Sequence, residues 1–549
     1  TNSQITFTGT VNSEATEAND LTISVGTSEV EFDSAVGGGT NGALGAIGIT
    51  GALDLDAAIT SASSLSVSTT SNLGANVTTS GTQTYTGAVT LSADVVLTTT
   101  NSNATFSSTI DSDDASTKRD LTLTLGSGTA SVTGIVGATS LDVLTLNSSS
   151  SFTAAVTATS IVNAASKTAT FSDAVTANIT NSGTLLFDAT DAKSVTGTIS
   201  EAAGGDTTEG QVINSANSEA PSVVTFTSTV AADTLTIGTT TYGGAALFEE
   251  AVTTPTINVV GGDHADEDST VTFNKAVTAS SGITLNDQTG DAKVIFAENN
   301  SVTITGTIDG ASSDEGTIQV TGATKTFASV IGGTQDLTLI DIDGTSIFNA
   351  AVSATNIDND GTATFKSNVT AATANDGTLT LTPNGNNNIT HTGAITGSGT
   401  LNAVEADDGA INSITFSTDV TAGTFNVGST TKSGVVILNG DTTVTNLNIY
   451  GGDANAEDST VTVNGDLDTT TTTLDDGTNS AVTKIIFADS DTVTISGAIT
   501  AATANDGTIQ VTGANKTFSG TIGGTRIGTL DIDETSTYTG AVTVNNLDI

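Results

Sequence analysis

The chain has 549 residues and carries 59 Asp and Glu against 12 Lys and Arg, a formal net charge of −47. This charge argues against nucleic-acid binding, which needs basic side chains to displace counterions from phosphates, and against docking on anionic lipid through basic residues. Such an acidic surface stays soluble and attracts divalent cations.

Cys, Met and Trp are all absent. Without Cys there are no disulfides or zinc–thiolate sites, so stability must come from burial and hydrogen bonding. Because a full-length translation product contains Met, we expect a processed or partial chain whose signal peptide has been removed. Apolar runs stay shorter than the roughly 18 residues of a membrane span. We therefore expect a secreted protein with no membrane span.

Alternation with period two predicts short, half-buried strands throughout the chain, with Leu, Val or Ile on one face and Thr on the other. The clearest examples are 120–125, 233–238, 459–465 and 491–497. Gly, Asn and Asp separate these segments and supply turns. Convincing helical periodicity is missing, and the pattern predicts an all-β chain.

A second motif pairs an aromatic residue with a Val or Ile four positions later. The pairs are Tyr85/Val89, Phe226/Val230, Phe248/Val252, Phe273/Val277, Phe348/Val352, Phe365/Val369, Phe518/Ile522 and Tyr538/Val542. The residue two after the aromatic would share its face in a straight strand, yet this position holds Glu250, Lys275 and Gly520 among others. We infer a corner, where the aromatic residue ends one strand and Val or Ile opens the next.

Neighbouring aromatic residues of this motif lie 16 to 25 residues apart, the length of one coil of a β-solenoid. Stacking such coils places like residues above like, so the Phe side chains should form an internal column. We predict a right-handed parallel β-helix of roughly 25 coils. Tandem β-sandwich domains are the alternative, although their cores usually contain more large side chains and a Trp.

The sequence also contains a longer repeat of 190 to 196 residues, which spans many coils. Segment 151–177 matches 347–371, and segment 316–334 matches 507–525. We expect a diverged repeat in 1–151, copy A in 152–347, copy B in 348–537, and the truncated start of a further copy in 538–549.

The segment Gly81–Ile110 carries an aromatic-x-Gly-Ala-Val-Thr-Leu phrase and, one coil later, Thr-Phe-x-Ser-Thr-Ile. These phrases resemble the repeats of filamentous-haemagglutinin-like and autotransporter-like bacterial adhesins. The composition is similar to that of bacterial surface-layer proteins. The resemblance implies a right-handed parallel β-helix at a bacterial cell surface and a dependence on calcium.

Two acidic loops lie 190 residues apart, at Gly261–Asn274 and Gly451–Asn464. Three carboxylates recur at matching positions, and calcium takes six to eight hard oxygen ligands. The candidate metal ligands are Asp263, Glu267 and Asp268 in the first loop, and Asp453, Glu457 and Asp458 in the second. A solvated turn is the alternative, and the glycine-rich calcium nonapeptide lacks its third glycine here. His264 is replaced by Ala454, so a shared site does not depend on histidine.

The repeats Ile340–Ser346 and Leu530–Ser536 each contain Asp-Ile-Asp, with both Asp expected on the outer face, where a neighbouring molecule could share a cation. His264 and His391 fit no catalytic pattern, and we expect no enzymatic activity. The sequence favours an extracellular structural protein that self-assembles into a cell-surface layer, sheath or filament. The alternative is an adhesin stalk whose partners are cell-surface glycans or a host or neighbouring cell.

Overall fold

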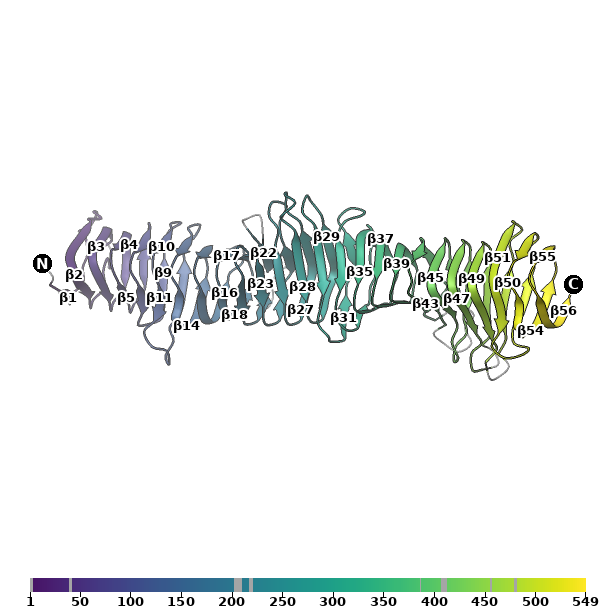
Figure 1. Ribbon diagram of the computed structural model, residues 1–549. Coiled ribbons are helices and arrows are strands. Elements are labelled where there is room, and N and C mark those ends of the chain that lie inside the picture. Colours follow the sequence, from purple (N-terminus) through teal and green to yellow (C-terminus); the bar gives the residue numbers. More distant parts are fainter. Residues whose placement is uncertain are drawn as a thin grey trace. The chain divides into compact units, whose positions relative to one another are not determined.

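The structure is a computed structural model that describes residues 3–38, 42–201, 210–216, 221–385, 387–405, 412–454, 457–477 and 481–549. Every regular element in these residues is a β-strand, and the strands pair in parallel (Figure 1). They stack in about 23 coils of a β-solenoid. The expected all-β solenoid is confirmed, and the sandwich alternative is wrong because sandwich sheets are antiparallel.

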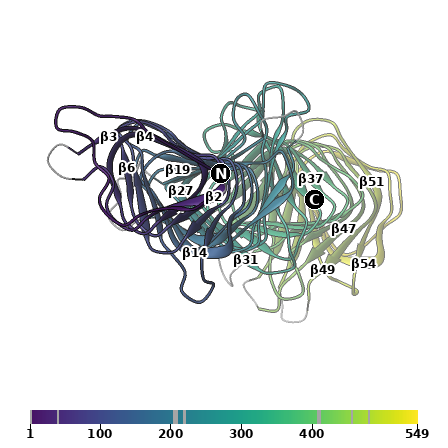
Figure 2. The ribbon, with the colours of Figure 1, turned by 90° about the vertical axis from the view of Figure 1, so that its left-hand side faces the viewer.

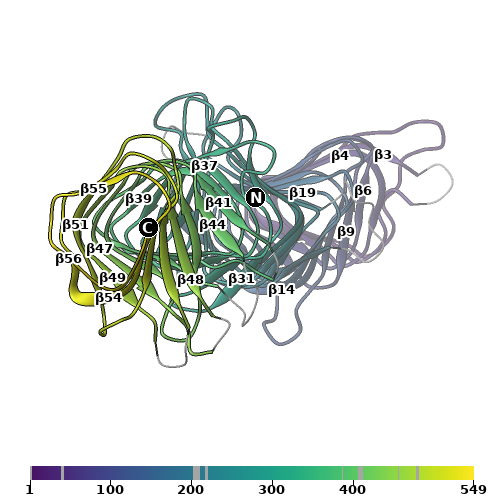
Figure 3. The same ribbon diagram turned by 90° about the vertical axis from the view of Figure 1, so that its right-hand side faces the viewer.

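The chain forms two compact units. Unit 1 comprises Thr1–Lys275 and Asp287–Asp291, and unit 2 comprises Ala276–Asn286 and Ala292–Ile549. Figure 2 shows the coils of unit 1 one behind another, and Figure 3 shows those of unit 2.

The strands of unit 1 are β1 (Ile5–Phe7), β2 (Leu21–Phe32), β3 (Leu44–Leu55), β4 (Ile59–Val67), β5 (Ser71–Leu73), β6 (Val77–Thr79), β7 (Gln83–Tyr85), β8 (Val89–Leu91), β9 (Val95–Thr98), β10 (Ala104–Phe106), β11 (Ile110–Ser112), β12 (Leu121–Thr124), β13 (Ala130–Val132), β14 (Val136–Leu146), β15 (Ser150–Phe152), β16 (Val156–Asn163), β17 (Thr168–Phe171), β18 (Val175–Asn181), β19 (Thr184–Asp188), β20 (Lys193–Thr196), β21 (Ile199–Glu201), β22 (Gln211–Ser215), β23 (Val223–Phe226), β24 (Val230–Ala231), β25 (Thr234–Ile237), β26 (Ala245–Phe248), β27 (Val252–Val260) and β28 (Ser269–Phe273).

The strands of unit 2 are β29 (Val277–Asn286), β30 (Ala292–Phe296), β31 (Val302–Thr305), β32 (Ile308–Gly310), β33 (Thr317–Val320), β34 (Lys325–Phe327), β35 (Leu337–Ile342), β36 (Thr345–Phe348), β37 (Val352–Asn359), β38 (Thr362–Phe365), β39 (Val369–Asn375), β40 (Thr378–Leu381), β41 (Ile389–Thr392), β42 (Ile395–Thr396), β43 (Thr400–Ala403), β44 (Ser413–Phe416), β45 (Val420–Val427), β46 (Val435–Leu438), β47 (Thr442–Tyr450), β48 (Ser459–Val463), β49 (Leu467–Asp475), β50 (Thr483–Phe487), β51 (Val493–Ala501), β52 (Thr508–Val511), β53 (Lys516–Phe518), β54 (Ile522–Ile532), β55 (Ser536–Tyr538) and β56 (Val542–Asp548).

The predicted corner after each aromatic residue is confirmed. Phe348 ends β36 and Val352 opens β37, and both side chains are buried. The same break separates Phe226 from Val230. The chain bends between the two positions, because Ala350, which would point inward with Phe348 in a straight strand, is only half-buried and lies in neither strand. Each corner therefore turns the chain from one face of the coil to the next.

The predicted aromatic column is present inside each unit as shorter stacks. In unit 1 the two stacks, Phe152–Phe171–Phe187 and Phe226–Phe248–Phe273, have neighbouring centroids 4.7 to 5.6 Å apart. Phe187 and Phe226 are not register partners and meet edge to face at 5.2 Å. In unit 2 Phe348 lies between Phe327 and Phe365, with centroids 4.8 and 4.6 Å away. Offset ring contacts of this kind stabilise beyond the burial of apolar area alone.

Coil length varies more than the sequence predicts. Phe171 and Phe187 are register partners 16 residues apart, whereas Val195 and Phe226 are 31 apart, beyond the expected limit of 25. The extra residues lie between strands, where lengthening a loop costs little free energy. The stacked strands therefore keep their register while the coil lengthens at its corners.

One corner of unit 2 is built from stacked glycines. A Cβ atom on any of four glycines would collide with the carbonyl oxygen of the glycine one coil earlier; the column runs through Gly322, Gly344, Gly361, Gly377 and Gly399. Only glycine lets the backbone of successive coils approach this closely.

Buried asparagines join neighbouring coils by side-chain hydrogen bonds. The amide of Asn163 donates to Oδ1 of Asn181 at 2.8 Å, and that of Asn359 donates to Oδ1 of Asn375 at 2.6 Å. All four side chains are at most 2 % exposed. Each pair satisfies the donating amide of one asparagine and the oxygen of the other, whereas Oδ1 of Asn163 and of Asn359 is buried without a partner among the described residues.

Candidate metal centre

The two acidic loops occupy equivalent places and share the same backbone hydrogen bonds in their described residues. The first connects β27 to β28 in unit 1, and the second connects β47 to β48 in unit 2. The N–H of Gly262 donates to the Glu267 carbonyl at 2.8 Å, and that of Gly452 donates to the Glu457 carbonyl at 3.0 Å. The repeat in the sequence is therefore a repeat in local structure.

The glutamate of each loop folds back beneath its own turn. Oε2 of Glu267 accepts the N–H of His264 at 3.1 Å, and Oε2 of Glu457 accepts that of Ala454 at 3.0 Å. Glu267 is 1 % exposed and Glu457 is 2 % exposed. A Cβ on Gly452 would collide with the Glu457 carboxylate, which accounts for glycine there.

The last aspartate of each loop points away from the turn and binds the next stretch of backbone. Oδ1 of Asp268 accepts the N–H of Asp291 at 2.8 Å, and Oδ1 of Asp458 accepts that of Val482 at 2.8 Å. Both aspartates are exposed. Two of the three carboxylates predicted in each loop thus have different roles: the glutamate bonds inside the turn and the last aspartate bonds between coils.

The first loop does bring potential metal ligands together. One ligand atom each from Asp263, His264 and Glu267 lie within 4.8 Å of one another. Nδ1 of His264 is 2.8 Å from Oδ1 of Asp263 and 3.6 Å from Oε2 of Glu267. The hydrogen bond with Asp263 and then its charge raise the pKa of His264. Sequence reasoning had set this histidine aside because the second loop has Ala454 at the matching position. In that loop both Asp453 and Ala454 are exposed.

A second group of carboxylates, which the sequence did not single out, lies near the start of unit 1. Carboxylate oxygens of Glu31, Asp33 and Asp56 lie within 4.8 Å of one another. The side chains of Gln4 and Thr6 already donate to Oε2 of Glu31 at 2.9 and 2.8 Å. This group is partly satisfied within the chain.

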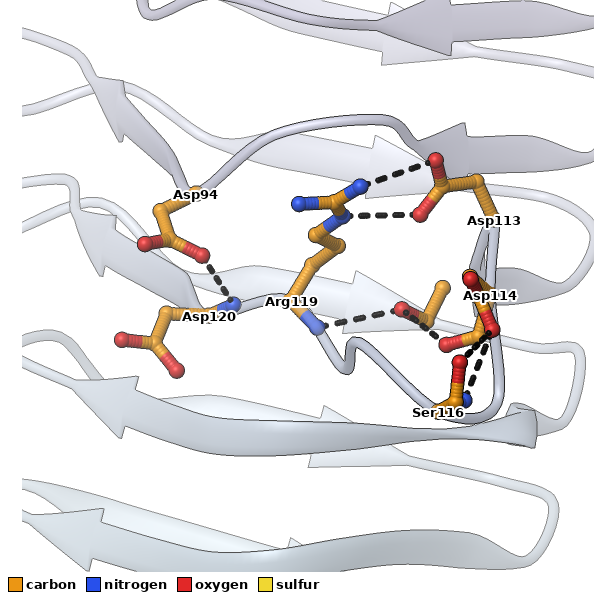
Figure 4. A network of polar contacts seen from close by, with 7 residues as sticks. Asp94, Asp113, Asp114, Ser116, Arg119 and Asp120 are labelled. Carbon is orange, nitrogen blue, oxygen red and sulfur yellow. Dashed lines mark hydrogen bonds and ion pairs between the residues drawn. The ribbon is translucent and has the colours of Figure 1, made fainter.

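Acidic residues at other corners accept backbone hydrogen bonds in the same way as Asp268. Oδ1 of Asp94 accepts the N–H of Asp120 at 3.0 Å (Figure 4). In unit 2, Oδ1 of Asp419 accepts the N–H of Asp441, and Oδ1 of Asp441 accepts that of Asp466. Much of the acidity of this chain therefore serves to cap amides between coils.

Arg119 lies beside this cap and pairs with Asp113. Its guanidinium donates to both carboxylate oxygens of Asp113, at 2.7 and 3.0 Å (Figure 4). The hydrogen bond from Arg119 is the largest cause of the lowered pKa of Asp113. The arginine thus binds an acid of its own loop.

The Asp-Ile-Asp repeat points outward as expected. Ile340 and Ile342 are fully buried, Asp341 lies between them on the outer face, and Asp343 is exposed. Asp341 is in register with Asp358 of the next coil. Burial raises the pKa of Asp341, and the charge of Asp343 raises it further.

Several buried polar groups escaped the sequence reasoning. They are His391, Glu405, Lys325 and Lys516, each at most 2 % exposed. The signal for His391 was present, because His391 and Ile395 have the spacing of the aromatic corner motif and His391 contacts Phe416 in the column, with ring centroids 6.2 Å apart. Lys325 and Lys516 occupy matching positions in the repeat.

Within the described ranges, no helix is long and apolar enough to cross a membrane. Searches of family models, of curated proteins and of solved structures found no match to this chain.

Proposed function

We propose that this chain is an extracellular structural protein that self-assembles into a cell-surface layer, sheath or filament, with divalent cations at acidic contacts between copies. One observation carries the proposal. In both units the aromatic rings, buried amides and carboxylates join each coil to the next, as in the series Asp419, Asp441 and Asp466. Such cross-links suit a load-bearing scaffold, and a catalytic role is not proposed.

Outward carboxylates at coil spacing support a role for cations. Burial raises the pKa of Asp358, and the charges of Asp360, Asp376 and Asp343 raise it further, so these carboxylates repel one another. Copies with a charge of −47 also repel each other. A divalent cation between two such rows would offset this repulsion, and calcium accepts carboxylates from several directions.

The test is electron microscopy of the purified chain in calcium, in chelator and in a monovalent salt of equal ionic strength. We expect ordered sheets or filaments in calcium alone. A variant with Asp341, Asp358 and Asp360 changed to Asn should need several-fold more calcium. The control removes three exposed charges elsewhere, by changing Glu14, Glu17 and Glu250 to Gln.

A chain that stays monomeric in every condition would contradict assembly. That result would favour the alternative of an adhesin stalk, for which a screen of cell-surface glycans is the next experiment. Equal calcium requirements in the two triple variants would show that Asp341, Asp358 and Asp360 have no specific role in assembly.

A further inference from the structure

Two buried glutamates in unit 2 each have one carboxylate oxygen without a hydrogen-bond partner among the residues that the structure describes. Glu457 uses Oε2 to accept the N–H of Ala454, but its Oε1 is buried and unbonded. Glu405 uses Oε1 to accept the N–H of Asn412 at 2.9 Å, but its Oε2 is buried and unbonded. Each side chain is 2 % exposed.

These glutamates lie at the same corner of nearby coils. Glu405 follows β43, and its N–H donates to the carbonyl of Ser433 in the next coil at 2.9 Å. The following residue, Gly434, donates its N–H to Oγ of Ser459 at 2.9 Å, two residues past Glu457 in the coil after that. The corner therefore places Glu405, Ser433 and Glu457 in successive layers.

The charge of Glu457 acts on the carboxyl of Glu405. Burial raises the pKa of Glu405 most, the N–H of Asn412 opposes this shift, and the charge of Glu457 raises the pKa further. A buried carboxylate is costly unless it is paired or fully hydrogen-bonded. Lys432 lies in the intervening turn and is half-buried, but one ammonium group can neutralise only one of two carboxylates.

Copy A offers a matched comparison. There the N–H of Ala216 donates to the Gly243 carbonyl, as that of Glu405 donates to the Ser433 carbonyl. Ala216 therefore occupies the position of Glu405, and Glu267 occupies that of Glu457. No oxygen of Glu267 is buried without a partner in the structure. The unbonded oxygens thus occur where a second glutamate is present.

We propose that Glu405 and Glu457 bind one divalent cation, with calcium preferred, at this corner within a single chain. A divalent cation neutralises both carboxylates and takes the two unbonded oxygens as ligands. Calcium accepts the irregular geometry of side-chain oxygens, backbone carbonyls and water, whereas magnesium demands a near-ideal octahedron. The site is independent of assembly, because both ligands come from one copy.

The test is calcium titration of the monomeric full chain by calorimetry at about 0.15 M KCl, which screens exposed carboxylates. Terbium luminescence provides a second readout, because Tyr450 directly precedes the second loop and can sensitise a bound ion. We expect one saturable site, with affinity at least about tenfold lower in Glu405→Ala and in Glu457→Gln. Glu405→Ala installs the copy A residue, Ala216, and should fold.

Two controls separate this site from other acidic groups. Asp263→Asn in the first loop should leave the saturable site unchanged, and Tyr450→Phe should abolish the luminescence while calorimetric binding persists. The proposal is overturned by the lack of a saturable site, which would mean that the glutamates share a proton. Unchanged affinity in Glu405→Ala would overturn it equally. Both outcomes are independent of whether sheets or filaments form.

Discussion

The hydroxyl of Thr373 lies 3.0 Å from Nε2 of His391 in the interior of unit 2. Nδ1 of the same ring lies 3.1 Å from the carbonyl of Gly393. Since a carbonyl only accepts, Nδ1 carries the proton and Nε2 accepts from the threonine. The imidazole is neutral, and burial lowers its pKa from 6.5 to about 4.

This lowered pKa predicts that unit 2 loses stability in mild acid. Between pH 6.5 and about 4 the unfolded chain binds a proton at His391 and the folded chain does not, so the free energy of unfolding falls as the pH falls. The stability is complete above pH 6.5, and about 3 kcal/mol is lost by pH 4. Urea unfolding at a series of pH values measures the slope.

The control for this prediction is His391→Phe, which places at this position the residue found at its register partner Phe416. Combining it with Thr373→Val removes the hydroxyl that would lose its partner. The double variant should lose stability less steeply between pH 6.5 and 4. Identical slopes in wild type and variant would show that His391 does not set this dependence.

A buried ammonium provides a second test. Nζ of Lys516 donates to the carbonyls of Asp489, Asp491 and Ala514 at 2.5, 2.8 and 3.2 Å, and the side chain is 1 % exposed. Lys516→Met keeps the stem but leaves three carbonyls without their donor. We expect it to lower the free energy of unfolding by about 2–4 kcal/mol.

Hydrogen exchange should show faster opening of the turn around Asp489 in this variant. Lys484→Met is the matched control, because Lys484 lies on the outer face of β50, and it should change stability by less than about 0.5 kcal/mol. Equal losses in both variants would argue against a specific role for the buried ammonium.

The aromatic column predicts a graded loss when one ring is removed. Phe348→Ala leaves a cavity between two stacked rings and should cost about 3–5 kcal/mol in unfolding free energy. Phe348→Leu refills most of the space and should cost roughly half as much. Thr364→Ala, on the outer face of β38, should cost less than about 1 kcal/mol. Denaturant titration measures the unfolding free energy of the three variants. Similar losses in all three would contradict a stabilising role for the stacked rings.

Acid caps between coils should depend on a hydrogen-bond acceptor and not on charge. At comparable corners the side chains of Asn76 and Asn368 accept the N–H groups of Val96 and Thr390, at 2.8 and 2.9 Å. Asp441→Asn should therefore keep its bond to Asp466, whereas Asp441→Ala should lose about 0.5–1.5 kcal/mol. Thermal unfolding of both variants distinguishes these outcomes. If Asp441→Asn lost as much stability as Asp441→Ala, the effect would be due to the charge of the carboxylate.

The elements that sequence reasoning predicted are those encoded by neighbouring residues. The corner needs only an aromatic residue and a Val or Ile four positions later, and the inward and outward faces follow from alternation. The column follows because parallel stacking repeats the same position. Coil length was predicted less well, since residues inserted between strands leave the buried pattern unchanged.

The groups that sequence reasoning missed depend on contacts between residues far apart in the chain. Glu405 lies 52 positions before Glu457 in the sequence, and the two are related only because the intervening chain completes the stacked coils. In the acidic loops, the three matching carboxylates were correctly recognised as a repeat. The separate roles of the glutamate and the last aspartate could not be predicted, because they depend on which backbone amide the next coil brings within reach.

The caps between coils also have a direction. Asp94, Asp268, Asp419 and Asp441 each accept an amide hydrogen from a residue further along the chain. A polypeptide made or exported from its N-terminus therefore presents each acceptor before the amide that needs it has emerged. For these bonds, the order in which the coils can close is the order in which the chain becomes available.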